Sequence, residues 1–394
     1  MDLHKVMFNR KIISEINLLA SQFRVLTLLG PRQSGKTTLT RMAFPDYEYL
    51  SLEDPDHRQY ATDDPRGFLN DHPKRVIFDE VQRVPQLLSY IQTRVDGDKI
   101  KAQFILTGSH QLELGAAITQ SLAGRTAVLK LLPLSMAELY EDQSVPDIDS
   151  LLLDGFMPGK HADQIDTVRF YRAYFQTYVE RDVRQIINLK DANKFEKMVR
   201  LCAGRIGQLI NQVSLANDVG VSATTINEWL SVLEASFIIF RLQPYHDNMG
   251  KRLIKTPKLY FVDTGLAAWL LGIETKVQMQ RDPLRGNLFE NLVILDRLKS
   301  YYNQGRDPSL FFYRDSHGNE VDLIEKQHNG LLATEIKSAQ TWHSSFSKGL
   351  DHFSALKKNV ENHIIYGGEQ SRVTEKYRLV SYQELAEFGE IQIK

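Results

Sequence analysis

A run of residues near the N-terminus has the types and the spacing needed to hold the phosphates of a nucleotide. The run comprises Gly30, Pro31, Arg32, Gln33, Ser34, Gly35, Lys36, Thr37 and Thr38, and it matches G-x-x-x-x-G-K-[ST]. Glycines let backbone N–H groups curl around a phosphate without a Cβ in the way. In this pattern Lys36 reaches the β- and γ-phosphates, and the Thr37 hydroxyl ligates Mg²⁺. The segment therefore predicts a site for Mg-ATP.

Two acidic residues end a later apolar run. Residues 75–80 read RVIFDE, so a predicted buried strand delivers Asp79 and Glu80 to its end. We expect Asp79 to reach the metal ion and Glu80 to orient or activate the attacking water. The alternative is that Glu80 is only a solvated carboxylate in a turn.

A second group of charged residues lies near the C-terminus. Glu290 falls in a helix-compatible run, Asp322 in a short apolar strand, and Glu335 and Lys337 at the end of the next strand. Strand alternation places Glu335 and Lys337 on the same face. The order and context resemble the PD-(D/E)xK core of restriction-endonuclease-like folds, in the archaeal Holliday-junction-resolvase branch. This chain departs from that pattern in having valine, not proline, before Asp322.

The resemblance implies roles for these residues. Asp322 and Glu335, together with the Ile336 carbonyl, would hold Mg²⁺ through oxygen ligands. Glu290 would add a ligand directly or through water, and Lys337 would position or activate the attacking water. The alternative is a nuclease-like fold used for binding or as a scaffold.

The middle of the chain predicts a helix-turn-helix. Residues 214–236 give two helical stretches around a tight turn at 220–222, with Ser222 as the N-cap of the second helix. Residues 237–242 and 259–262 would form wing strands. The residues expected on the exposed face of the second helix are Thr224, Thr225, Asn227 and Glu228.

Basic residues between the proposed wing strands would contact DNA phosphates. They are Lys251, Arg252, Lys255 and Lys258. The alternative is a lid or a protein interface, which is a common use of winged helices in ATPases. Glu228, with Asp218 nearby, would repel phosphate, yet the pattern favours DNA binding.

The elements that must position the nucleotide site form an alternating pattern. Short apolar runs are separated by helix-compatible stretches, which predicts a parallel α/β sheet. The runs cover residues 23–29, 47–52, 75–78, 103–107 and 126–132. We expect an amphipathic helix over residues 1–22 before the first strand. The helix after the glycine turn would direct its positive dipole end at the phosphates.

Several segments together resemble a prokaryotic family of AAA-type P-loop ATPases with a C-terminal region of unassigned function. They read GPRQSGKTTL, RVIFDEVQ, FILTGSHQLEL, SLAGR, YVERDVR, KLYFVDTGL and GNLFE. The resemblance covers roughly residues 20–340 and implies an AAA-like core, a winged helix and a nuclease-like fold. In AAA-type enzymes a polar residue after the fourth strand senses the γ-phosphate, a role that falls on Ser109, with Thr107 beside it.

The resemblance also gives Arg125 two possible roles. AAA-type enzymes place an arginine finger before the last strand, where it reaches the ATP of a neighbouring subunit in a homo-oligomer. The alternative is a surface or strand-anchoring arginine, and the sequence does not separate the two.

Composition limits the partners. The 394 residues carry a net charge of -1, so the chain cannot coat nucleic acid by charge alone and any DNA contact must be local. The single cysteine allows no intramolecular disulfide, which fits a reducing compartment. No apolar run is long enough to span a bilayer. We expect a cytoplasmic protein without membrane contact.

These observations predict three parts: residues 1–141 as an α/β AAA-type ATPase domain, 150–283 as a helical region with a winged helix, and 284–394 as a mixed α/β nuclease-like domain. The leading interpretation is an ATP-hydrolysing enzyme acting on DNA, coupled to a metal-dependent nuclease-like domain that binds or cleaves DNA, including branched DNA. One alternative is a nucleotide-switched DNA-binding protein with an inactive nuclease fold. Another is a protein remodeller that never contacts nucleic acid.

Overall fold

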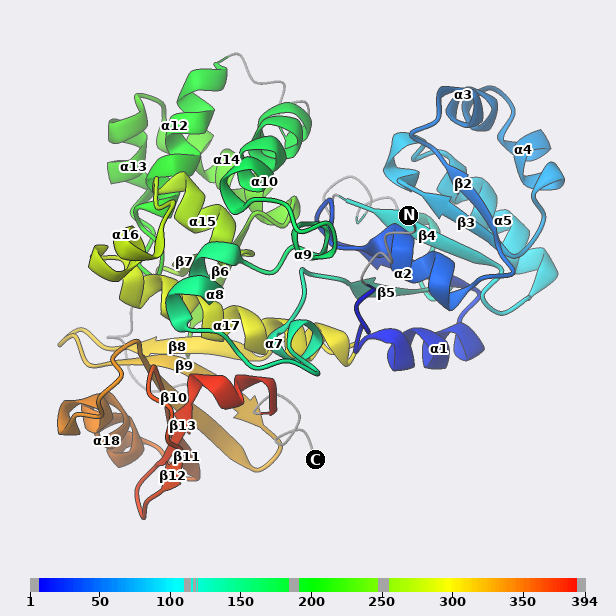
Figure 1. The fold of residues 1–394 in the computed structure, drawn as a ribbon. Coiled ribbons are helices and arrows are strands. Elements are labelled where there is room, and N and C mark those ends of the chain that lie inside the picture. Colours follow the sequence, from blue (N-terminus) through cyan, green and yellow to red (C-terminus); the bar gives the residue numbers. More distant parts are fainter. Residues whose placement is uncertain are drawn as a thin grey trace.

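The computed structural model describes residues 7–109, 115, 118, 120–183, 191–246 and 255–387 (Figure 1). Its N-terminal part is built on five strands, all paired in parallel, in the order β2-β3-β4-β1-β5. The strands are β1 (Val25–Leu29), β2 (Glu48–Ser51), β3 (Val76–Asp79), β4 (Phe104–Gly108) and β5 (Thr126–Lys130). Every residue of β1, β3 and β4 is buried, which explains their uninterrupted apolar sequences.

Helices cover both faces of this sheet. They are α1 (Ile13–Gln22), α2 (Lys36–Ala43), α3 (Pro55–Asp63), α4 (Pro65–Asp71) and α5 (Leu87–Asp98), with a 3₁₀ turn η1 at Val81–Arg83. Ile16 of α1 and Leu39 of α2 share one core with Leu26 and Leu28, whereas Ile91 of α5 packs in the core of the opposite face.

The N-terminal lead-in differs from the prediction. A helix was expected over residues 1–22, but α1 begins at Ile13 and residues 7–12 are not helical. Their non-helical course brings the buried Arg10 side chain to the loop that follows β1, where it donates to the Ser34 carbonyl at 2.7 Å.

The middle part is helical, as predicted. Its helices are α8 (Ile148–Asp154), α9 (Pro158–Ala162), α10 (Thr167–Tyr174), α12 (Ala192–Ala203), α13 (Gln212–Val219), α14 (Ala223–Ala235), α15 (Thr264–Leu270) and α16 (Lys276–Arg281), and the short helix α7 (Met136–Leu139) before them ends the N-terminal part. A π-helical segment, η2 (Phe175–Val183), continues α10. Among the helices of the described segments, none combines the length and the apolar character that crossing a membrane requires.

The C-terminal part is built on a mixed sheet in the order β12-β13-β11-β10-β9-β8-β6-β7. The strands are β6 (Ile239–Pro244), β7 (Lys258–Phe261), β8 (Leu310–Arg314), β9 (Glu320–Gln327), β10 (Gly330–Lys337), β11 (Val360–Tyr366), β12 (Arg372–Val373) and β13 (Arg378–Ser381). Phe353 of α18 (Lys348–Leu356) packs in the core on one face, and Leu292 of α17 (Arg285–Asn303) packs on the other. Two 3₁₀ turns, η3 (Ser344–Ser347) and η4 (Tyr382–Glu384), complete this part.

The two strands expected to form a wing belong to this C-terminal sheet. β6 and β7 pair antiparallel, as a wing would, but β6 also pairs in parallel with β8 through Gln243 and Phe311. The middle and C-terminal parts therefore share one hydrogen-bonded sheet.

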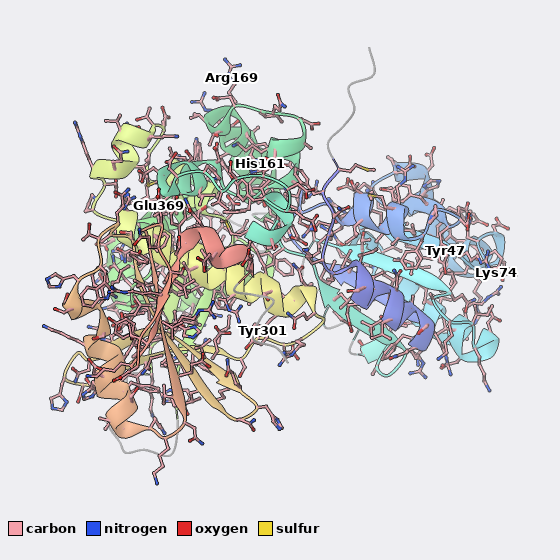
Figure 2. The ribbon with its side chains drawn as sticks, turned by 60° about the horizontal axis from the view of Figure 1, so that its bottom comes forward. Tyr47, Lys74, His161, Arg169, Tyr301 and Glu369 are labelled. Atoms are coloured by element: carbon pink, nitrogen blue, oxygen red, sulfur yellow. The ribbon has the colours of Figure 1, made fainter. Side chains whose placement is uncertain are left out.

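Helix α17 connects all three parts. Figure 2, in which Tyr301 marks this helix, shows it between the N-terminal part, marked by Tyr47 and Lys74, and the C-terminal strands. Asp296 accepts from the backbone N–H of Met136 at 2.7 Å, and Lys299 donates to the Leu134 carbonyl at 2.8 Å. The same helix thus holds both the end of the N-terminal part and the C-terminal sheet.

Candidate nucleotide site and C-terminal carboxylate cluster

The loop between β1 and α2 has the backbone geometry of an anion-binding turn. Gly30 lies so close to β5 that a Cβ on it would be 2.0 Å from the Leu131 carbonyl oxygen. Gln33 and Gly35 both have left-handed backbones, with φ of 61° and 91°. Such a turn makes successive N–H groups converge, and the N-terminus of α2 adds its positive dipole end. The buried Ser34 hydroxyl has no hydrogen-bond partner among the described residues, which leaves it available to a phosphate.

Lys36 is buried at the first position of α2. Its Nζ donates to the carbonyls of Gly30 and Pro31 at 2.8 and 2.9 Å. Burial lowers the pKa of Lys36, and the carboxylates of Glu80 and Asp79 partly oppose that shift. A buried ammonium at the mouth of this loop would gain strongly from a phosphate.

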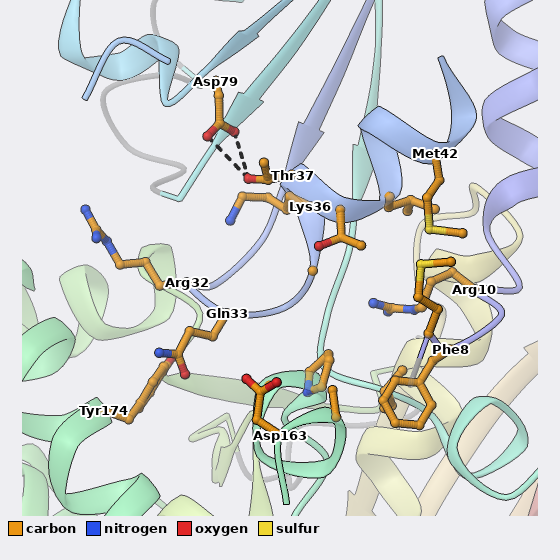
Figure 3. A pocket seen from close by; sticks show the side chains of 18 of the residues that line it. Phe8, Arg10, Arg32, Gln33, Lys36, Thr37, Met42, Asp79, Asp163 and Tyr174 are labelled. Carbon is orange, nitrogen blue, oxygen red and sulfur yellow. Dashed lines mark hydrogen bonds between the residues drawn. The ribbon is translucent and has the colours of Figure 1, made fainter. Parts of the chain in front are cut away.

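Thr37 and Asp79 come together beside Lys36 (Figure 3). The Thr37 hydroxyl lies 3.2 and 3.3 Å from the two carboxylate oxygens of Asp79. Tyr49 donates to Asp79 at 2.7 Å, and Thr107 also donates to it. This all-oxygen donor set, with the carboxylate fixed by its neighbours, suits a hard divalent cation.

Glu80 is held in a strained and buried position at the end of β3. Its backbone is left-handed, with φ of 56°, which costs a non-glycine residue of the order of 1–3 kcal/mol. The carboxylate accepts from Ser109 at 2.9 Å and from Gln82. Burial acts to raise the pKa of Glu80, but Lys36, Gln82 and Ser109 outweigh burial and lower it. Glu80 is therefore an ionised base close to Lys36.

The turn forms one wall of a cleft of about 1330 Å³ between the N-terminal and middle parts. Arg32, Gln33 and Thr38 lie on the phosphate side, and Arg32 pairs with Glu53 at 2.5 Å. Apolar and aromatic side chains line the rest, among them Phe8, Ile13, Met42, Pro158, Phe170 and Tyr174, several of which Figure 3 shows. The cleft thus joins a phosphate-binding end to an apolar end suited to a nucleobase.

Two residues that support the cleft were not among the predicted site residues, although Tyr178 begins the segment YVERDVR. Arg10 clamps the turn, because its guanidinium donates to Ser34, to the Leu132 carbonyl and to Glu138, each within 3.0 Å. Tyr178 lines the cleft, and its hydroxyl donates to the Ser236 carbonyl at 2.7 Å and lies 3.4 Å from the Ser109 carbonyl. Ser236 is the C-cap of α14, so Tyr178 joins the end of β4 to the predicted DNA-reading helix.

The C-terminal carboxylates do come together. Asp322 accepts from the Ile336 N–H at 2.8 Å and from Lys337 Nζ at 3.0 Å, and Lys337 also contacts Glu335 at 2.5 Å. Burial acts to raise the pKa of Asp322, but Lys337 and Lys258 lower it to about 2. Burial and the neighbouring Asp322 raise the pKa of Glu335 to about 9. Their contact thus pushes the pKa values of the two carboxyl groups apart, and Asp322 is the more acidic of the pair.

Lys258 lies elsewhere than predicted. It was expected to contact DNA phosphates, but it is 2% exposed and lies on β7 against the carboxylate cluster. Its Nζ is 2.9 Å from Glu290 and 2.5 Å from Glu320. Among the described residues, no three His, Cys, Asp or Glu side chains are arranged to hold a metal ion. In this arrangement the Lys258 ammonium occupies the Glu290 oxygen that a divalent cation would need as a ligand.

The helix-turn-helix forms as predicted. Ser222 caps α14 by accepting from the Thr225 N–H at 3.0 Å. Ile226, Trp229, Leu230 and Leu233 are buried, whereas Thr224, Asn227 and Glu228 are exposed. Asp218, which was expected to repel phosphate, pairs with Arg205 at 2.5 Å. Lys255 is exposed, and Lys251 and Arg252 lie outside the described residues.

Sequence comparison identifies the N-terminal part. Residues 22–140 match a family model described as an AAA domain. This part is an AAA-type ATPase domain. Residues 145–277 and 285–385 match two models described as domains of unknown function, DUF8612 and DUF4143.

Similar proteins occur in several prokaryotes. Uncharacterized proteins of Mycobacterium bovis and Mycobacterium tuberculosis are each 29% identical over 350 residues, which is 88% of this chain and 77% of theirs. A Walker-type ATPase of Pyrococcus abyssi has 16% identity and a TM-score of 0.42, covering 67% of this chain and 96% of that one. DnaA from Aquifex aeolicus, bound to AMPPCP, has 16% identity and a TM-score of 0.29, covering 57% of this chain and 86% of that one.

Arg125 of the AAA domain does not line the nucleotide cleft of its own chain. Its carbonyl accepts from Val25 at the start of β1, whereas the phosphate turn follows the end of that strand. Two of its guanidinium nitrogens donate to Asp96, at 2.8 and 2.6 Å, and Arg24 contacts the same carboxylate. The geometry shows a strand-anchoring contact, and a role towards a second subunit stays a prediction.

Replacement of Glu80 by glutamine tests the assignment of the base. The Glu80→Gln variant should keep ATP binding, because Lys36 and the turn are unchanged, while turnover falls by about 10²–10⁴-fold. Equilibrium binding of a fluorescent ATP analogue and steady-state phosphate release would measure the two effects. Asp46→Asn, at an exposed position before β2, is the matched control. Wild-type turnover in Glu80→Gln would refute the assignment.

Proposed function

We propose that this chain hydrolyses Mg-ATP in the cleft between its AAA domain and its middle part, and that it uses this reaction to act on DNA. The uncovered polar face of α14 is the observation that carries the DNA part of the proposal. Thr224 and Asn227 are exposed on it, while the opposite face of the helix is packed. Short polar side chains on the second helix of a helix-turn-helix are suited to contacts in a DNA groove.

The chemistry of hydrolysis would be divided among residues already in contact. Thr37 and Asp79 would hold Mg²⁺, which neutralises charge on the phosphates when it is bound. Lys36 would exchange its two carbonyl partners for phosphate oxygens. Glu80, which is ionised, would orient the attacking water and accept its proton. Ser109 and Gln82 fix the Glu80 carboxylate. They would therefore determine when this carboxylate can orient the water and accept its proton.

Tyr178 provides a route between hydrolysis and DNA. One hydroxyl joins Ser109, which contacts the base Glu80, to the C-cap of α14. A change in the hydrogen bonds of Glu80 would thus reach the helix that is proposed to contact DNA. The near-neutral net charge is compatible with such a contact, because the proposal needs only a local surface.

DNA cleavage is a second candidate function. The observation that favours it is the contact of Lys337 with both Asp322 and Glu335, which is the arrangement expected of a PD-(D/E)xK core. Since the Lys258 ammonium lies against Glu290, this arrangement does not support a metal-dependent step. Binding of DNA, including branched DNA, by the C-terminal part does not depend on such a step.

A negative charge on α14 tests the DNA surface. Asn227→Glu should weaken the affinity for duplex or four-way-junction DNA on the order of tenfold, because it places a carboxylate against phosphates. Fluorescence anisotropy over a range of salt concentrations would measure the affinity. Asn17→Glu, on the exposed face of α1, introduces the same charge far from α14 and should have no effect. Equal affinities of wild type and Asn227→Glu would contradict the proposal.

We also propose that Arg125 acts towards the nucleotide of a second copy of the chain. Release from Asp96 would free its guanidinium to stabilise transition-state charge in that copy. Turnover per chain should then rise with protein concentration in the wild type and stay low in Arg125→Ala. Asp46→Asn should behave as the wild type. If Arg125→Ala turned over ATP at the wild-type rate at every protein concentration, Arg125 would not act as an arginine finger.

A further inference from the structure

A buried lysine from the middle part lies within the carboxylate cluster of the C-terminal part. Lys258 is on β7, and its ammonium contacts Glu290 at 2.9 Å and Glu320 at 2.5 Å. Tyr260, two residues further on the same face of the strand, donates to Glu290 at 2.5 Å. The strand therefore presents two donors to the one carboxylate that was expected to complete a metal site.

The backbone around Lys258 fixes its position. Lys258 pairs with Leu242 of β6 and forms a bridge with Leu209 on its other side. The next residue, Leu259, exchanges hydrogen bonds with Gly207 and Gln208, at 2.7 and 3.1 Å. Lys258 is thus held on both sides, unlike a mobile surface lysine.

The segment 207–209, which hydrogen-bonds to β7, also covers Glu290. Gly207 has a φ of 70°, and a Cβ on it would be 2.9 Å from the Asn287 amide nitrogen and 3.5 Å from Glu290 Oε2. A side chain at this position would be strained and would crowd Asn287. Glu290 is therefore enclosed by β7 and by the segment around Gly207.

Each carboxylate of the cluster already has a cationic neighbour. Lys258 forms ion pairs with Glu290 and Glu320, and Lys337 forms ion pairs with Asp322 and Glu335. Arg314 adds a contact to Glu320 at 3.1 Å. A hard divalent cation needs these oxygens as ligands and would be repelled by an ammonium only a few ångströms away.

We propose that Lys258 is the resident cation of the C-terminal carboxylate cluster and that it excludes divalent metal ions while β7 is seated. The ammonium itself shows that the cluster attracts a cation. Because β6 follows α14 in the chain and pairs with β7, a displacement of the helix-turn-helix that moved β6 and β7 away from the C-terminal part would withdraw Lys258 and open the cluster to metal. The middle part is thus an autoinhibitory element for the C-terminal part, whether or not the chain acts on DNA.

Metal binding by the full-length chain without nucleotide tests this proposal. All proteins would carry Asp79→Asn, which removes the metal ligand of the ATP site. Titration with Mn²⁺, followed by electron paramagnetic resonance of the free ion, should detect no specific site in this parent. Lys258→Met should gain a site that binds Mn²⁺ at least about tenfold more tightly than the parent protein does. Adding Asp322→Asn to Lys258→Met should abolish this site. Lys255→Met, an exposed lysine of the same segment, should behave as the parent.

Thermal unfolding gives a second readout, which can still be used if a Lys258 variant is only partly folded without metal. Mn²⁺ should raise the melting temperature of Lys258→Met and leave that of the parent unchanged, and Lys258→Gln should respond in the same direction. Two results would overturn the proposal: a parent site for Mn²⁺ that disappears in Asp322→Asn, or no gain of Mn²⁺ binding or stabilisation in either Lys258 variant. Since neither readout involves DNA or ATP turnover, failure of the proposed function would leave this result interpretable.

Discussion

The buried polar side chains of α17 impose the constraint on which the rest of the structure depends. An unsatisfied buried polar group costs about 1–3 kcal/mol, so each of these side chains needs a partner, and the partners lie in different parts of the chain. Asn291 pairs with the backbone of Phe261 on β7, and Asp296 with the backbone of Met136. Arg297 forms two hydrogen bonds with Glu325 of the C-terminal sheet. The helix therefore keeps the end of the AAA domain, the β6–β7 pair and the C-terminal sheet in register.

That constraint also places two distant sites against the same helix. Arg10 connects the phosphate-binding turn to Glu138, and Glu138 also accepts from Asn303 at the end of α17. Lys258 and Tyr260 contact Glu290 near the start of the same helix. A movement of α17 relative to the AAA domain would change the surroundings of both the nucleotide and the carboxylate cluster. The proposed function and the proposed gate thus draw on the same helix.

Much of the AAA domain and of the nucleotide site could be predicted from the sequence. Parallel strands buried on both faces give continuous apolar runs, and all five predicted runs contain the observed strands or differ from them by one residue. The phosphate turn, Thr37, Asp79 and Glu80 lie at the ends of these strands, so their meeting follows from the topology. Ser222 and the apolar spacing after it likewise located α14, because an N-cap and a helical period are local signals.

The remaining features depend on contacts between residues far apart in the sequence. Arg10 meets a carboxylate 128 positions away, and nothing near it in the chain indicates that partner. Lys258 belongs to a stretch rich in basic residues, which suggested a DNA contact, but the pairing of β6 with β8 carries it to the C-terminal sheet. Pairing between distant strands is set by tertiary packing, so the sequence alone could not distinguish an exposed lysine from a buried counter-ion.

The rate of ATP hydrolysis with and without DNA tests the central claim most directly. The full-length chain would be assayed alone and with duplex, single-stranded and four-way-junction DNA, beside Glu80→Gln to show that the turnover belongs to this site. The account predicts that DNA raises the rate of the wild type, most with the junction, and leaves Glu80→Gln inactive. A wild-type rate that is the same with and without every DNA would contradict it.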